Sequence, residues 1–216
     1  MKKYLFIILT SLSLVACEEP RSNARAVYLL LDTSGTYTAE MDKAQKIMNY
    51  LLASLDSGDS IAIARIDSGS FSEKDIIAKV TFDDRPSTAI QQKRQFKAQI
   101  DIFVEATQRG SRHTDITGGM MQASEYLAET GAGEKYVLIF SDLEEDLQKG
   151  HIRDFPISLP DIQVTALNVT KLRSDNIDPR DYLERLQLWE KRVHQAGGSW
   201  GVINDLERMD RLIAKR

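Results

Sequence analysis

A short polar segment with oxygen-bearing side chains follows directly on an apolar run. The run covers residues 27–31, and after it comes Asp32-Thr33-Ser34-Gly35-Thr36. A buried strand that ends in a carboxylate and hydroxyls places hard oxygen atoms at the edge of a sheet. Such oxygens are ligands for Mg²⁺, Mn²⁺ or Ca²⁺ and suit zinc or copper poorly. The same residue types also cap helices, so the segment alone leaves a helix N-terminus as an alternative.

Two later segments offer oxygen ligands of the same kind. Thr114 opens the pattern Thr-x-x-x-x-Gly-Met, and Asp142 follows an apolar run over residues 137–140. Each has an ordinary alternative, because Thr114 and Asp115 can cap a helix and Asp142 can be a turn residue. In parallel sheets ligands bind at the carboxyl ends of the strands. Asp142 is expected at such an end.

The order of the elements predicts the fold class. Continuous apolar runs predict strands covered on both faces, and apolar stripes at helical spacing predict helices between them. Only a short turn precedes the third strand, so that strand is expected to be antiparallel at an edge. The predicted fold is α/β: a doubly wound, Rossmann-like, mostly parallel central sheet with helices on both faces. Strands are predicted over residues 27–31, 60–66, 75–82, 135–140, 161–169 and 199–203, and helices over residues 38–55, 87–107, 114–130, 178–196 and 205–214.

This element order and the three polar segments together resemble the von Willebrand factor type A (VWA) domain. The spacing Asp32-x-Ser34-x-Thr36 is similar to the first motif of that family's metal-binding site, known as MIDAS, and Thr114 and Asp142 match the other two motifs. Thr36 stands where Ser is commoner in the family, but it keeps the hydroxyl. The resemblance implies a divalent cation, Mg²⁺ first and Mn²⁺ or Ca²⁺ as alternatives. Ser34, Thr36 and Thr114 would supply hydroxyl ligands, and Asp32 and Asp142 would supply charge.

The resemblance also implies a function. An open coordination position on the cation would take a carboxylate from an Asp or Glu of a partner protein, and the predicted function is metal-dependent protein binding. Arg112, His113 and Glu144 are candidate partner contacts, although loop residues facing solvent and a solvated acidic run over residues 144–146 are the ordinary alternatives. The alternative function is a structural or assembly scaffold, or a subunit of a larger envelope complex, with a non-essential metal site.

The N-terminus predicts a bacterial lipoprotein. Two lysines precede an apolar segment over residues 4–15, too short to span a bilayer, which ends in Leu14-Val15-Ala16-Cys17. This tetrapeptide resembles a lipobox, so residues 1–16 are interpreted as a signal peptide, residues 17–25 as the lipidated Cys17 and a short tether, and residues 26–216 as the VWA domain. An ordinary cleaved signal with a free thiol is the alternative. Glu18 favours the outer membrane, with the domain facing the periplasm.

Composition and missing motifs exclude other classes. Removing residues 1–16 changes the net charge from −4 to −6, because Lys2 and Lys3 are lost, and an acidic chain is a poor nucleic-acid binder. Cys17 is the only cysteine, so no internal disulfide can form. The sequence has no Gly-x-Ser-x-Gly elbow and no phosphate-binding loop, and its three histidines lack metal-ligand spacing. We therefore expect a protein that is not an enzyme.

Overall fold

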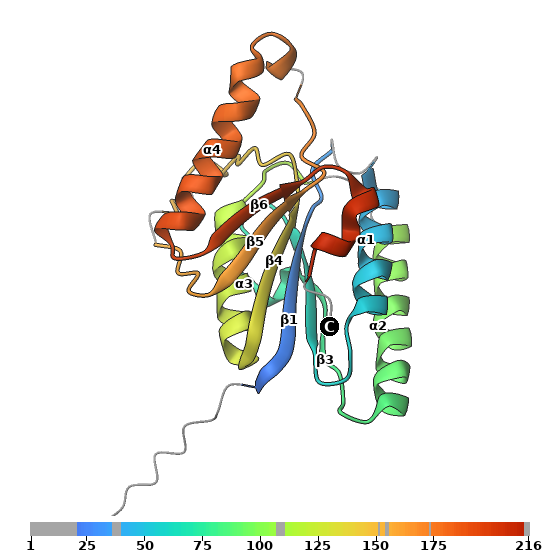
Figure 1. Ribbon diagram of the computed structural model, residues 1–216. Helices are drawn as coiled ribbons and strands as arrows, with labels where there is room; N and C mark the ends of the chain where they lie inside the picture. Colours follow the sequence, from blue (N-terminus) through green and yellow to red (C-terminus); the bar gives the residue numbers. More distant parts are fainter. Residues whose placement is uncertain are drawn as a thin grey trace, which may run out of the picture.

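The computed structural model describes residues 21–35, 40–106, 111–150, 152–153, 156–172 and 174–213. A single six-stranded sheet in the order β3-β2-β1-β4-β5-β6 forms its centre (Figure 1). All pairings in this sheet are parallel except that of β2 with β3, which confirms the predicted fold class and its antiparallel edge strand. The strands are β1 (Arg21–Asp32), β2 (Ser60–Ile66), β3 (Ile76–Thr81), β4 (Ala132–Phe140), β5 (Ile162–Leu167) and β6 (Ser199–Ile203). The α-helices are α1 (Met41–Ser54), α2 (Pro86–Ala106), α3 (Ile116–Glu129) and α4 (Pro179–Gln195), and short 3₁₀ helices are η2 (Glu73–Asp75), η3 (Ser174–Asn176) and η4 (Leu206–Arg211).

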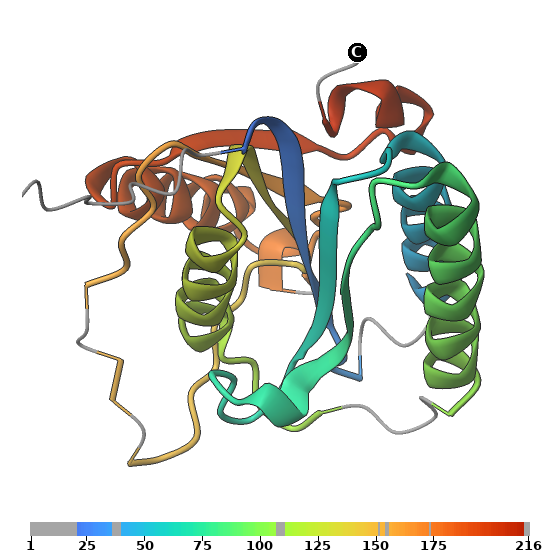
Figure 2. The ribbon, with the colours of Figure 1, turned by 90° about the horizontal axis from the view of Figure 1, so that it is seen from below.

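Helices cover both faces of the sheet. Figure 2 shows α1 and α2 on one side and α3 and α4 on the other. Successive side chains of a strand point to opposite faces, so β1 contributes to two cores. Leu29 and Leu31 pack in the core beneath α1 and α2, whereas Tyr28 and Leu30 pack in the core beneath α3 and α4. All four side chains are fully buried, as the continuous apolar run predicts.

Two elements differ from the pattern read from the sequence. β1 begins at Arg21, within the segment interpreted as a tether, because the buried Arg25 finds acceptors in the chain. Its backbone N–H and its guanidinium both donate to the Asp59 carboxylate, at 2.8 Å from N and 2.9 Å from Nε. The final helix is a 3₁₀ helix, η4, whose Arg208 has non-helical dihedral angles. Hydrophobic periodicity predicts neither the early start of β1 nor the 3₁₀ form of the final helix.

The strand register brings the ends of four strands to one edge. Asp32 of β1 lies opposite Ile66 of β2, and Phe140 of β4 lies opposite Leu31 of β1 and Leu167 of β5. The residues that follow these strands therefore emerge side by side at the carboxyl edge of the sheet. Within the described ranges, no helix is both long enough and apolar enough to cross a membrane.

Candidate functional site

Three loops meet at the carboxyl edge of the sheet. The loop after β1 pairs with the segment before α3, where Ser34 and Ser111 form a β-bridge and Ser111 N donates to Thr33 O at 2.7 Å. That segment in turn pairs with the loop after β4. Thr114 and Asp146 exchange two backbone hydrogen bonds, of 2.8 and 3.0 Å. The structure thus brings together the three polar segments that the sequence singled out.

Asp32 ends β1 with a buried carboxylate. Its side chain is held by hydrogen bonds at both oxygens: Ser34 N donates to Oδ1 at 2.8 Å, and Ser141 Oγ donates to Oδ2 at 2.7 Å. Only 1% of the residue is exposed. Burial raises the pKa of Asp32 above its usual range, although the hydrogen bonds from Ser141 and Ser34 act in the opposite direction. No lysine, arginine or histidine in the described chain forms an ion pair with this carboxylate.

Asp142 is the second buried carboxylate at this edge. It is 4% exposed, and its Oδ1 accepts a hydrogen bond from Glu144 N at 3.0 Å. Burial raises the pKa of Asp142 to about 6, and the negative charges of Asp32 and Glu144 contribute to the rise. Arg185 donates to the backbone carbonyl of Asp142 at 2.8 Å, not to its carboxylate. Among the described residues, the Asp142 carboxylate too has no ion-pair partner.

Two buried carboxylates without an ion-pair partner are costly, because burial disfavours the charged form, and the charge of Arg185 only partly offsets this at Asp142. A divalent cation bound between the loops would compensate both. The described chain has no group of three or more His, Cys, Asp or Glu that could hold a metal ion. A site here would therefore depend on hydroxyl oxygens as well, as the sequence predicts. Ser34 and the buried Thr114 stand in these loops, whereas Thr36 lies outside the described residues.

The predicted partner contacts divide into exposed and engaged residues. Arg112 and Glu144 are exposed at the rim of the site. His113 is partly covered, and its Nδ1 lies 2.9 Å from Asp146 Oδ2. Glu145 is not a solvated member of an acidic run. It accepts from Thr117 N at 2.7 Å, in the first turn of α3, and pairs with Arg192 of α4 at 3.0 Å.

Side chains of helix α4 hold the loop after β4 in place. Besides its bond to Asp142, Arg185 pairs with the buried Asp175 at 2.8 Å. Trp189 donates from its indole nitrogen to Leu143 O at 3.0 Å, and Leu143 itself has a positive φ of 65°. Sequence reasoning missed both supports and also missed Ser141. The hydroxyl of Ser141 next to Asp142 in the sequence could have indicated a further polar residue at the site. No local pattern in the sequence connects α4 with this loop.

Comparison with known proteins gives similar structures but no sequence match. No family model and no curated protein sequence matches the chain. The chain is similar to an aerotolerance-related membrane protein from Bacteroides fragilis, solved with multiple mutations to serines, at 11% identity and a TM-score of 0.45, over 88% of this chain and 96% of that one. It is similar to a von Willebrand factor type A protein from Catenulispora acidiphila at 11% identity and a TM-score of 0.48, over 87% of this chain and 40% of that one. It is also similar to BatB from Bacteroides thetaiotaomicron, a conserved hypothetical protein, at 13% identity and a TM-score of 0.42, over 87% of this chain and 93% of that one.

Proposed function

We propose that this chain is a VWA-type binding module of the bacterial cell envelope that captures an acidic residue of a partner protein through a divalent cation. Ser34, Thr36 and Thr114 would hold the cation, Mg²⁺ in the first place, by their hydroxyl oxygens, directly or through water. Asp32 and Asp142 would supply the negative charge. A cation with neutral hydroxyl ligands and one open position has a strong affinity for a further anionic oxygen, which the partner carboxylate would provide. We propose no catalytic role for these residues.

One observation carries the proposal. Asp32 and Asp142 are both buried at the carboxyl ends of adjacent parallel strands, and neither carboxylate forms an ion pair in the described chain, although the charge of Arg185 acts on Asp142 from a distance. Ordinary structural carboxylates elsewhere in this protein are paired. Asp115 pairs with Arg153, and Asp175 pairs with Arg185. Because an uncompensated buried charge lowers stability, its presence at a strand end is typical of a functional site.

The surface beside the site gives a partner room to bind. A pocket of about 530 Å³ lies between the loop after β4 and helix α4. Leu143 and Trp189 form part of its lining, together with the half-exposed Leu188. The exposed Glu144 lines it next to the candidate cation site. Residues that flank the partner's acidic side chain would contact this pocket and the exposed Arg112.

Thermal unfolding with and without cations tests the proposal. Residues 18–216 keep every described element and would be melted in chelator and in Mg²⁺, Mn²⁺ or Ca²⁺. A cation that binds only the folded state stabilises it by about 2.7 kcal/mol at a hundredfold excess over its dissociation constant. We expect a rise in melting temperature for the wild type and none for Asp32→Ala. The control Asp84→Ala changes an exposed aspartate near the opposite edge of the sheet and should retain the full rise.

The contrary result is also informative. An equal rise in wild type and Asp32→Ala would place cation binding elsewhere on the protein. No rise with any cation would contradict a cation site in the isolated protein and would favour the scaffold alternative.

The anchoring part of the proposal is tested separately. Cys17 lies outside the described residues, so the support for a lipid anchor is the signal-like segment and the Leu-Val-Ala-Cys sequence. Cys17→Ser should move the protein from the membrane fraction to the soluble fraction. A variant that remains membrane-bound after a carbonate wash would contradict the anchor.

A further inference from the structure

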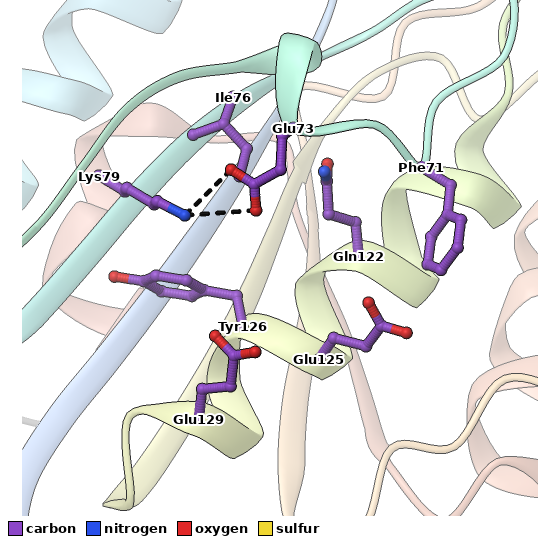
Figure 3. Close-up of a pocket in the computed structure, with 8 residues that line it drawn as sticks. All are labelled: Phe71, Glu73, Ile76, Lys79, Gln122, Glu125, Tyr126 and Glu129. Carbon is purple, nitrogen blue, oxygen red and sulfur yellow. Dashed lines mark hydrogen bonds and ion pairs between the residues drawn. The ribbon is translucent and has the colours of Figure 1, made fainter.

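A second pocket lies between helix α3 and the segment that connects β2 with β3. It has a volume of about 140 Å³, and none of its lining residues belongs to the candidate cation site. Figure 3 shows the α3 residues on one side and the residues around η2 and β3 on the other. The pocket combines an aromatic ring, a buried amide and several carboxylates. Each of these limits the kind of ligand it can bind.

The aromatic wall is Tyr126. Its ring packs against the buried Tyr28, with ring centroids 5.5 Å apart and a tilt of 60°. Burial raises the pKa of Tyr126, and the nearby charge of Glu129 adds to the effect, so the ring stays a neutral phenol. Ile76 also lines the pocket and adds apolar surface. A neutral aromatic face of this kind accommodates an apolar stem and attracts a cation.

The buried amide is Gln122. It is only 7% exposed, and its Oε1 accepts a hydrogen bond from Tyr28 at 2.9 Å. In Figure 3 its side chain rises from α3 between Glu73 and Phe71. Its amide nitrogen donates no hydrogen bond within the described part of the chain. No buried side-chain nitrogen or oxygen of the described residues lacks a partner, so this amide nitrogen is accessible from the pocket and is free to donate to a ligand oxygen.

The carboxylates leave the pocket with excess negative charge. Glu73 is neutralised by Lys79, whose Nζ lies 3.3 and 3.1 Å from its two oxygens. Glu125 and Glu129 stand one helical turn apart on α3 and line the same pocket. Both are exposed, and neither has an ion-pair partner among the described residues. The unpaired charge at this pocket is therefore negative.

We propose that this pocket binds an alkylammonium or guanidinium group on an apolar stem, next to a neutral oxygen acceptor. The stem would lie on the Tyr126 ring, the cation would lie between Glu125 and Glu129, and the oxygen would accept from Gln122. A lysine or arginine residue of a protein has this chemistry, because its side chain supplies the stem and the cation and its backbone carbonyl supplies the oxygen. A free diamine supplies the stem and the cation but not the oxygen. This inference does not depend on the cation site.

Calorimetric titration of the full chain in nonionic detergent and chelator tests the proposal. The probe is N-acetyl-lysine N-methylamide, and the neutral comparison is N-acetyl-norleucine N-methylamide, which has a similar stem but no charge. We expect the lysine probe to bind and the norleucine probe not to bind. The double variant Glu125→Gln with Glu129→Gln keeps the shape of both side chains. It should weaken binding by up to about 25-fold, because each of the two exposed ion pairs contributes up to about a fivefold effect. Glu190→Gln, an exposed glutamate on α4, is the matched control and should bind as wild type.

Putrescine distinguishes the two sources of the cation. Tighter binding of the lysine probe than of putrescine would identify a protein side chain, since only the probe carries an amide oxygen for Gln122. Equal binding would identify a free amine and keep the pocket as a cation site. The proposal is overturned if the lysine probe does not bind, if the norleucine probe binds equally well, or if the double variant keeps the wild-type affinity.

Discussion

Buried carboxylates lie near both ends of strand β1, but they differ in whether an ion pair compensates their charge. At the amino end, the fully buried Asp59 accepts three hydrogen bonds from Arg25, of 2.8, 2.9 and 2.7 Å. At the carboxyl end, Asp32 and Asp142 are almost as deeply buried, and neither carboxylate has an ion-pair partner in the described chain. The first end is complete within the protein. At the second, the described chain supplies no ion-pair partner for either carboxylate.

The difference predicts that the two ends respond differently to substitution. A buried ion pair with good geometry stabilises its surroundings only while both partners are present, and the loss of one leaves a buried charge alone. A carboxylate with hydrogen bonds but no counter-charge lowers stability until a cation binds. Substitutions at the two ends should therefore change stability in opposite directions.

Arg25→Met is expected to have the largest effect. It removes the counter-charge of Asp59 and also a hydrogen bond of 2.9 Å to Ser54 O. Removing one partner of a buried pair costs about 3–5 kcal/mol of unfolding free energy. Urea unfolding measures the change. The matched control is Arg85→Met, which breaks an exposed Arg–Asp pair and should change the unfolding free energy far less. Equal losses in the two variants would show that burial does not distinguish these pairs.

Asp142→Asn is expected to act in the opposite direction. The amide oxygen can still accept from Glu144 N, while the buried charge next to Asp32 disappears. In chelator the variant should gain about 1–2 kcal/mol of unfolding free energy, since one pKa unit corresponds to about 1.4 kcal/mol. In saturating Mg²⁺ it should gain nothing further, unlike the wild type. Urea unfolding in both conditions is the measurement. A variant that is less stable than the wild type in chelator would remove the contrast between the two ends.

Glu144→Gln should have the smallest effect, because the Glu144 side chain is exposed and its carboxylate forms no hydrogen bond or ion pair with a described residue. Its unfolding free energy should stay within about 0.5 kcal/mol of the wild type. The neighbouring Glu145→Gln is the sharper comparison, because it weakens the pair with Arg192 and the hydrogen bond from Thr117 N. It should cost about 1 kcal/mol or more. A larger loss for Glu144 than for Glu145 would contradict the separation of this acidic run into exposed and engaged residues.

The sequence predicted the features that depend on local pattern. Apolar runs located the strands, and the short turn before β3 predicted its antiparallel direction. Placing Asp32 and Asp142 at one edge followed from strand order, since parallel strands end together, whereas Thr114 precedes a helix and its place followed from the resemblance to the VWA domain. The cation itself stays a prediction.

Features that depend on distant partners could not be predicted. From the sequence, Arg25 is interpreted as a polar tether residue. Its partner Asp59 comes after α1 in the chain, and only the fold places the two side chains together. Glu145 reads as a solvated acid until Arg192 of α4 is brought to it. Each pair joins residues far apart in the chain, and neither residue type signals its partner. Periodicity reports which residues are buried, but it does not report which charges meet.

Under the proposed lipid anchor, the length of β1 would also set a height above the membrane. Its 12 residues are joined by steps of about 3.3 Å, so its two ends lie at most about 36 Å apart. With a lipid on Cys17, only residues 18–20 would lie between the anchor and the start of the strand. The amino edge of the sheet would then rest near the bilayer, and the carboxyl edge would face away from it. Proteins free in the surrounding compartment could approach that edge directly, whereas a partner embedded in the same membrane would need a domain about as tall to reach it.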